Sequence, residues 1–187
     1  PPSHVDVQLH RGRSDLQIVT QAESLDTFVT LRADPDRFAE ASALLEVAER
    51  LAPEGEGDRR RYDMLVGALR TLDQRPSPLL VPAFFLKALA HEGLAPALDA
   101  CVRCQATEDL VAVDVGEGGV LCDACRRGRP VSESALAVMR AVLGGHLATA
   151  LEVEDARVCG EVDAVATDAV EYHLERRVRS RRVMETA

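Results

Sequence analysis

The sequence has few aromatic residues, and this scarcity limits the kind of core that it can build. It contains no Trp, two Tyr and four Phe among 187 residues, although hydrophobic residues make up 47%. The core must therefore consist mainly of Leu, Val and Ala, which suits packed helices better than a β-sandwich. A chain of this length forms one domain or two small ones.

Long apolar runs and targeting segments are also missing. No run approaches the about 18–20 apolar residues that span a bilayer, and the first residues do not resemble a signal peptide. We therefore expect no membrane association, and cysteines spaced for metal rather than for disulfides favour the cytoplasm. The chain begins with Pro1 and Pro2 rather than Met, which indicates a piece of a longer protein.

The charge is unevenly distributed along the chain. The formal net charge is −9, which by itself argues against binding to nucleic acid. Acidic residues concentrate in 23–58 and 151–171, whereas arginines cluster in 59–61, 126–129 and 176–182. The last cluster has two interpretations: cations that complement the C-terminal end of a helix, or a row suited to follow a phosphate backbone.

Four of the five cysteines form a pattern typical of a metal site. Cys101 and Cys104 form one Cys-x-x-Cys pair, Cys122 and Cys125 form a second, and 17 residues separate the pairs. Two such pairs with a spacer of about 15–20 residues are typical of structural zinc. The spacer predicts a hairpin, with a strand over 110–115, a Gly-rich turn over 116–119 and a short return to Cys122. We therefore predict one structural Zn²⁺ per chain, held in a zinc ribbon.

Other interpretations of the cysteines fit less well. Four thiolates leave no open position for a catalytic water, so a zinc hydrolase is disfavoured. A redox pair needs a single Cys-x-x-Cys, and deaminase chemistry needs a His-x-Glu that is absent. His91-Glu92 begins a metalloprotease-like motif, but Ala95 replaces its second His. Cys159 has no partner at ligand spacing and is interpreted as a small, partly buried residue.

The remaining sequence predicts a mainly α fold. Residues 4–10 and 16–19 alternate in polarity and predict a hairpin at the edge of a sheet whose other strands lie outside the chain. Apolar spacing then predicts helices with these starts and core faces: after Asp34-Pro35, with Phe38, Ser42, Leu45, Ala48 and Leu51; after Asp58, with Tyr62, Leu65, Val66, Leu69 and Leu72; from Pro82, with Phe84, Phe85, Ala88 and Leu89; over 135–143 after Ser132; and over 161–183, with Val162, Ala166, Val170, Leu174 and Val178.

Three stretches together resemble the RecO family of bacterial recombination mediators. Residues 2–23 are similar to the last hairpin of the family's N-terminal OB-fold and its exit. Residues 93–104 are similar to the Gly-x-x-Pro lead into its first Cys-x-x-Cys, and 172–175 with Arg179-Ser180 are similar to its closing helix. One departure is Gln105, since Gly usually follows the second cysteine, where a positive φ is needed.

This resemblance implies a fold and a domain organisation. Residues 1–22 would be the C-terminal hairpin of an OB-fold that is otherwise missing. Residues 23–187 would form a helical domain with an embedded four-cysteine zinc-ribbon module at about 98–130.

The resemblance also implies a function without catalysis. The protein would bind single-stranded DNA and RecR, receive the tail of the single-strand DNA-binding protein, and promote strand annealing and recombinase loading in the nucleoid. The sequence offers no convincing nucleophile–base pair, phosphate loop or carboxylate dyad, so we expect no small-molecule substrate. The candidate nucleic-acid contacts are Arg11, Arg13, Arg126, Arg127, Arg176, Arg179 and Arg182.

A second function remains open on the residues alone. A zinc-stabilised protein-interaction scaffold that never touches DNA explains the acidic net charge more simply. The arginines that follow Cys125 would then only offset the negative charge of a four-thiolate zinc site.

Overall fold

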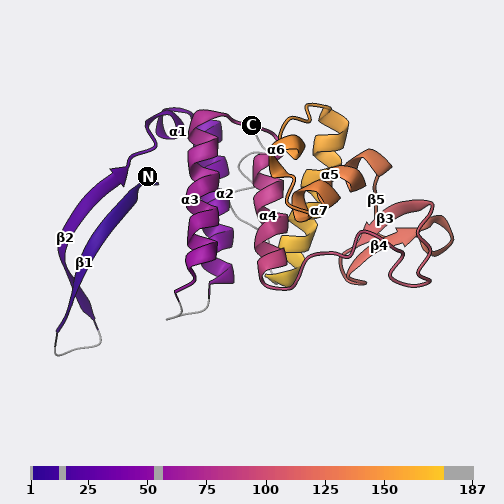
Figure 1. The fold of residues 1–187 in the computed structure, drawn as a ribbon, viewed down its shortest axis with the longest axis horizontal. Helices are drawn as coiled ribbons and strands as arrows, with labels where there is room; N and C mark the ends of the chain where they lie inside the picture. The colour runs from indigo at the N-terminus through magenta and orange to yellow at the C-terminus, as the bar shows by residue number, and fades with distance from the viewer. Residues whose placement is uncertain (1, 13–15, 53–56, 175–187) are drawn as a thin grey trace.

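The computed structural model describes residues 2–12, 16–52 and 57–174. Three parts lie side by side in space. A two-stranded hairpin lies at one end, a group of packed helices lies in the middle, and a three-stranded sheet lies at the opposite end (Figure 1). The described residues form seven α-helices, which confirms the predicted mainly α fold class with an embedded cysteine module. Every buried side chain of the described residues is hydrophobic.

The N-terminal hairpin forms as predicted, but its second strand is longer than expected. Strand β1 (His4–Arg11) pairs antiparallel with β2 (Gln17–Asp26). Both faces of the pair are open, and Leu9 and Ile18 are 53% and 58% exposed. Because a two-stranded sheet with no covered face is marginal in water, side-chain contacts at its base are needed to hold it to the helices.

Those contacts join the hairpin to one helix, α3 (Arg59–Gln74). The His4 imidazole and the Tyr62 hydroxyl form a hydrogen bond, and their rings meet edge to face at 5.7 Å. At the end of β2, Asp26 faces Arg70 at 3.6 Å and accepts a hydrogen bond from the Phe28 amide at 3.1 Å. The contacts among the described residues therefore hold the hairpin at its base.

A short helix that the sequence did not predict, α1 (Val29–Ala33), connects the hairpin to the helical part. Phe28 precedes it with φ 46°, a left-handed conformation that is uncommon for a bulky residue. Its side chain is 1% exposed, and the Leu31 amide donates to Asp73 at 2.7 Å. Burial of Phe28 offsets the backbone cost, a tertiary effect that local sequence patterns do not reveal.

Helices α2 (Pro35–Leu51) and α3 begin at the predicted caps. The Asp34 carboxylate accepts from the Asp36 and Arg37 amides at 3.0 and 3.2 Å, and Asp58 accepts from the Arg61 amide at 3.0 Å. Both carboxylates satisfy amides that have no partner within the helix. The predicted helix starts are confirmed.

The predicted core faces of these two helices were partly wrong. Phe38 and Leu45 are 39% and 37% exposed, and Tyr62 is 45% exposed. The true buried face of α2 combines Leu44 and Val47 with three alanines, and the alanines give only a weak periodic signal. The buried residues are Ala41, Ala43, Leu44, Val47 and Ala48 in α2 and Val66, Ala68, Leu69 and Leu72 in α3.

Helix α4 (Leu80–His91) is the centre of the core and begins two residues before Pro82, the predicted start. It contacts α2, α3, α5 and α7, so nearly all its sides are covered. The predicted core residues Phe84, Phe85, Ala88 and Leu89 are all buried. A helix that is apolar all round must lie inside the fold, and α4 does.

The C-terminal half packs on α4 after the cysteine module. Helix α5 (Glu133–Leu143) starts at the predicted Ser132 cap, whose hydroxyl accepts from the Ala135 amide at 3.2 Å. A short α6 (Leu147–Ala150), which was not predicted, leads to α7 (Ala156–His173).

The predicted range of the last helix, 161–183, was wrong at its start, and its part from 175 onward lies outside the described residues. Asp155 caps α7 by accepting from the Arg157 and Val158 amides, and the sequence reading overlooked this Asp. At the other end α7 stops at His173. The predicted core residues Val162, Ala166 and Val170 are buried, whereas Val178 lies outside the described residues. None of the described helices combines the length and apolar composition needed to cross a bilayer.

Candidate metal centre

The cysteine module is a three-stranded sheet that presents a turn bearing cysteines at each side. Strand β3 (Leu110–Asp114) pairs antiparallel with β4 (Gly119–Cys122), as predicted, and also with a short β5 (Arg129–Pro130) that was not predicted. Gly128 makes the second pairing possible. Its φ is +80°, and a Cβ there would lie 2.5 Å from the Val113 carbonyl oxygen.

The first cysteine turn closes through its own backbone. The Cys101 amide donates to the Ala106 carbonyl, and the Gln105 amide donates to the Cys101 carbonyl, both at 2.8 Å. Gln105 has φ 65°, the positive value predicted for the position where the family usually has Gly. Its side-chain amide also reaches the Cys101 carbonyl, at 3.3 Å, and this contact offsets part of the strain.

The segment before the first turn is bound to the hairpin. The Ala97 amide donates to Gly118, the Val120 amide donates to Ala97, and the Val102 amide donates to Val120, at 2.9, 2.8 and 3.0 Å. Gly119 lies where the two backbones meet, and a Cβ there would be 2.3 Å from the Ala97 carbonyl oxygen. This close approach fixes the first cysteine pair relative to the second.

The second pair is placed by the end of β4. Cys122 is the last residue of the strand, and a single 3-10 turn, η1 (Asp123–Cys125), brings Cys125 back toward it. The Asp123 amide donates to the Asp109 carbonyl at 2.9 Å. Cys101 and Cys122 are buried, whereas Cys104 is exposed and Cys125 is partly exposed.

The four sulfur atoms fit a tetrahedral metal ion. They lie within 4.8 Å of one another, and the Sγ atoms of Cys104 and Cys122 are 3.6 Å apart. With a Zn–S length of about 2.3 Å, a regular tetrahedron has edges of about 3.8 Å. The sulfur atoms are too far apart for a disulfide, which needs about 2.05 Å. The predicted ligands therefore converge on one site able to hold a metal ion.

The protonation of the thiols suits a site for a cation. The Cys122 amide donates to the Cys101 sulfur, and this and neighbouring amides lower the pKa of Cys101 to about 6. Hydrogen bonds that the Cys125 thiol donates to the sulfur atoms of Cys104 and Cys122, with burial, raise the pKa of Cys125 to about 12. Without an ion the cluster thus holds one thiolate easily and resists a full set, whereas a divalent cation favours all four.

The predicted nucleic-acid contacts near the module are engaged in ion pairs. Arg126 faces Asp123 at 3.3 Å, and Arg127 pairs with both Asp114, at 3.0 Å, and Glu117. Arg129 forms a two-point pair with Asp168 of α7 at 2.6 and 2.9 Å, and this pair raises its pKa.

The other predicted contacts are less informative. Arg11 is exposed at the end of β1, far from the module (Figure 1). Four candidates lie outside the described residues: Arg13, Arg176, Arg179 and Arg182. The predicted cations are thus not brought together into one basic surface by the described residues.

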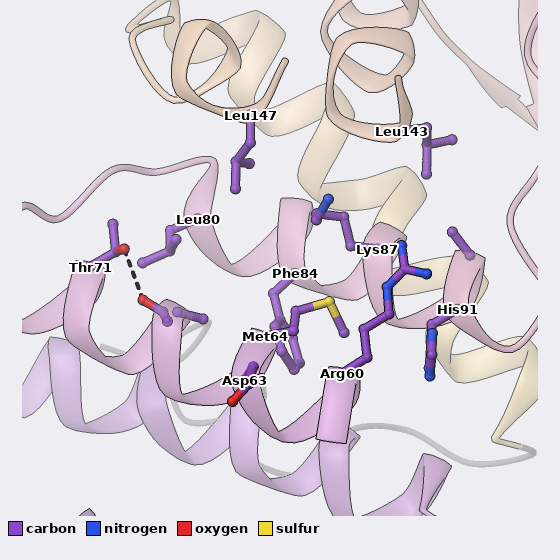
Figure 2. A pocket seen from close by; sticks show the side chains of 13 residues that line it. Arg60, Asp63, Met64, Thr71, Leu80, Phe84, Lys87, His91, Leu143 and Leu147 are labelled. Carbon is purple, nitrogen blue, oxygen red and sulfur yellow. Dashed lines mark hydrogen bonds between the residues drawn. The ribbon is translucent and has the colours of Figure 1, made fainter. Parts of the chain in front are cut away.

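A second feature, which the sequence reading missed, is a cavity of about 580 Å³ between α3, α4 and the α5–α6 region (Figure 2). Its walls are mostly apolar, with Met64, Leu80, Phe84, Leu143 and Leu147 among them. Arg60 extends from α3 toward α4, which contributes Lys87 and His91 (Figure 2). The one sequence signal was the run Arg59-Arg60-Arg61, which places cations in the first turn of a helix, where they oppose the dipole.

Some charged side chains around this cavity form ion pairs and others do not. Asp63 is paired with Arg59 at 2.9 Å, and His91 is hydrogen-bonded to Asp58, which lowers the pKa of Asp58 to about 2. Arg60 and Lys87 form no ion pair with any residue that the structure describes. Two free cations therefore border an apolar cavity.

Comparison with known proteins identifies the family of the chain. Residues 32–182 match the family described as Recombination protein O C terminal. The chain belongs to the RecO family. It is also 39% identical to a DNA repair protein RecO of Frankia casuarinae (strain DSM 45818 / CECT 9043 / HFP020203 / CcI3), over 193 residues that cover 100% of this chain and 79% of the relative. The family resemblance read from the hairpin, the cysteine module and the last helix is confirmed, and DNA repair and recombination are the context of this RecO-family chain.

Proposed function

We propose that the protein is a mediator of DNA repair and homologous recombination that binds single-stranded DNA and RecR and promotes strand annealing and recombinase loading. The observation that carries this proposal is the match to the RecO family over nearly the whole chain. The protein would act in the bacterial cytoplasm on nucleoid DNA, by binding and positioning strands rather than by catalysing a reaction.

The test is annealing of complementary strands by the complete natural protein without added nucleotide. Annealing should accelerate, and binding to single strands should weaken steeply as salt rises, because phosphate contacts release counterions. No acceleration together with a flat salt dependence would contradict the proposal. A protein-interaction scaffold is then the better function, and the net charge of −9 with Arg126, Arg127 and Arg129 all ion-paired favours that second candidate.

We further propose that the metal is one structural Zn²⁺ per chain. Four thiolates provide a soft, closed ligand set with no position for a substrate, which suits zinc in a structural role. Metal analysis of protein purified without chelator should find one zinc per chain, and Cys159→Ser should leave that content unchanged. Iron, or no metal at all, would overturn this assignment.

The cavity beside α4 is the proposed site for the tail of the single-strand DNA-binding protein. Its apolar walls suit bulky side chains, and Arg60 and Lys87 suit carboxylates of an incoming peptide. A synthetic peptide of that tail should bind the wild-type chain and lose most of its affinity for Arg60→Glu and Lys87→Glu. Arg126→Glu, a charge reversal on the cysteine module, is the matched control and should bind normally. Equal binding by all variants would remove the cavity from the proposal.

A further inference from the structure

The two cysteine turns are joined by an ion-pair bridge that uses none of the sulfur atoms. Arg103 lies inside the first Cys-x-x-Cys, and Arg127 lies two residues after the second. Both reach the same carboxylate, Glu117, in the turn between β3 and β4. Arg103 donates to it at 3.1 and 3.0 Å in a two-point contact, and Arg127 donates to the oxygen Oε1 that Arg103 also contacts.

Glu117 is itself fixed in place by Asp114. The Glu117 amide donates to Asp114 Oδ1 at 3.0 Å, and Asp114 Oδ2 faces Arg127 Nε at 3.0 Å. The carboxylates are largely covered, with side chains 24% exposed for Glu117 and 20% for Asp114. Two cations and two anions thus form a closed, electrically balanced group, and the two arginines lower the pKa of Glu117.

This geometry differs from that of an ordinary surface ion pair. Single exposed ion pairs contribute little to stability. A network that contains a two-point Arg–carboxylate contact is the case in which a measurable contribution is expected. The bridge connects segments that must stay together for four sulfur atoms to meet at one point. Glu117 is the one residue of the bridge that touches an arginine from each turn.

We infer that Glu117 is a positioning residue of the metal centre, which holds the two cysteine turns together through Arg103 and Arg127 and so slows release of the bound metal. The inference rests on the proposed zinc occupancy of the four cysteines. It concerns the rate of metal loss and the preorganisation of the ligands, because Glu117 supplies no ligand of its own.

The test is the rate at which zinc passes from the chain to a chromophoric chelator in excess. Glu117→Gln keeps the size of the side chain and removes its charge, and it should accelerate zinc release about threefold to tenfold at low ionic strength. At 1 M salt, where the screening length is about 3 Å, the difference from wild type should become smaller without disappearing, because these partly covered charges are screened less than exposed ones. Arg127→Gln removes one arm of the bridge and should give a smaller acceleration.

The control is Asp63→Asn, which removes an equal charge from a more exposed pair on α3, away from the module, where Arg59 Nε alone contacts both oxygens of Asp63. It should release zinc at the wild-type rate. The absorption spectrum of the Co²⁺-substituted protein should be the same in all variants, because the four thiolates remain the ligands.

The outcomes separate this inference from the zinc assignment. If the wild type binds zinc but Glu117→Gln and Asp63→Asn release it at the same rate, the inference is wrong and the zinc assignment stands. A difference that is unchanged at 1 M salt would attribute the effect to packing and would also overturn the inference. If Glu117→Gln fails to fold, zinc release from the wild type still decides, since a rate that does not rise with salt contradicts the bridge. If the wild type contains no zinc, the zinc assignment is wrong.

Discussion

The two ends of the molecule carry β-hairpins of similar simplicity that differ in how they are stabilised. In β1–β2 nearly every described residue is exposed, and contacts of His4 and Asp26 with α3 attach it to the rest. In β3–β4 most residues are buried, and a third strand, the segment 97–102 and the four-cysteine cluster surround it. The comparison teaches that a two-stranded unit becomes part of a stable fold only when something covers its faces. In the cysteine module that cover is present within the chain.

Loss of the proposed zinc site should have the largest effect on folding, and only at the end that carries the cysteine module. Cys122→Ser should abolish tight zinc binding and unfold the segment around 98–130, because the zinc contributes directly to folding of such sites. Helices α2–α4 should keep most of their circular dichroism, since α2, α3 and α4 pack mainly on one another and on α7. Limited proteolysis should locate new cleavage within 98–130. Cleavage spread evenly over the chain would show that the module and the helices form one cooperative unit.

The next largest effect should come from a Gly→Ala substitution, which should destabilise the cysteine module but not the helices. Gly119→Ala places a Cβ 2.3 Å from the Ala97 carbonyl oxygen, and we expect a loss of about 1–3 kcal/mol of unfolding free energy with weaker zinc retention. Gly67→Ala in α3 meets nothing within 4 Å and should be neutral or stabilising by up to about 1 kcal/mol. Denaturant titration of both variants measures the contrast. Equal stabilities would mean that the close approach of Ala97 and Gly119 is not maintained in solution.

A smaller difference in unfolding free energy is expected between the ion pairs that attach the two ends to the helices. Arg129→Gln breaks the two-point pair with Asp168 that joins β5 to α7, and should cost up to about 1 kcal/mol. Arg70→Gln removes one contact at 3.6 Å with Asp26 at the base of the hairpin and should cost almost nothing. Thermal unfolding at low and high salt compares them, and an Arg129 effect independent of salt would argue against an ion pair.

The smallest effect is expected from the hairpin itself. Ile18→Thr changes a side chain that is 58% exposed, so the unfolding free energy of this chain should change by no more than about 0.5 kcal/mol. Val113→Thr in β3, where the side chain is 2% exposed, is the control and should cost about 1–3 kcal/mol. In the complete natural protein, a larger cost for Ile18→Thr would indicate that other strands cover the hairpin.

The sequence predicted those features that depend on neighbouring residues. Asp34, Asp58 and Ser132 cap the helices that were expected, and the cysteine spacing identified four sulfur atoms that do converge. Features that depend on distant contacts were missed or misplaced. The face of α2 was assigned by Phe38 and Leu45, whereas packing against α3 and α4 buries Leu44 and Val47 together with alanines.

The candidate site also combines features that local sequence predicts with features that depend on distant contacts. The metal ligands follow from spacing alone, because the two turns are local and the spacer is short. The partners of Arg127 and Arg129 do not, because Glu117 and Asp168 are brought to them by the hairpin turn and by α7. The cavity beside α4 was also missed, since its lining comes from helices far apart in the sequence.

The burial of α4 has a consequence for how the chain is made. Synthesis proceeds from the N-terminus, so α4 leaves the ribosome before α5 and α7, which cover part of its surface. Until Ala156–His173 has been translated, an apolar helix with Phe84 and Phe85 stays partly uncovered and is open to chaperones and to aggregation. The cysteine turns follow α4 directly and need only local contacts to meet. Metal loading during translation would therefore complete a folded unit beside α4 before its last covering helix exists.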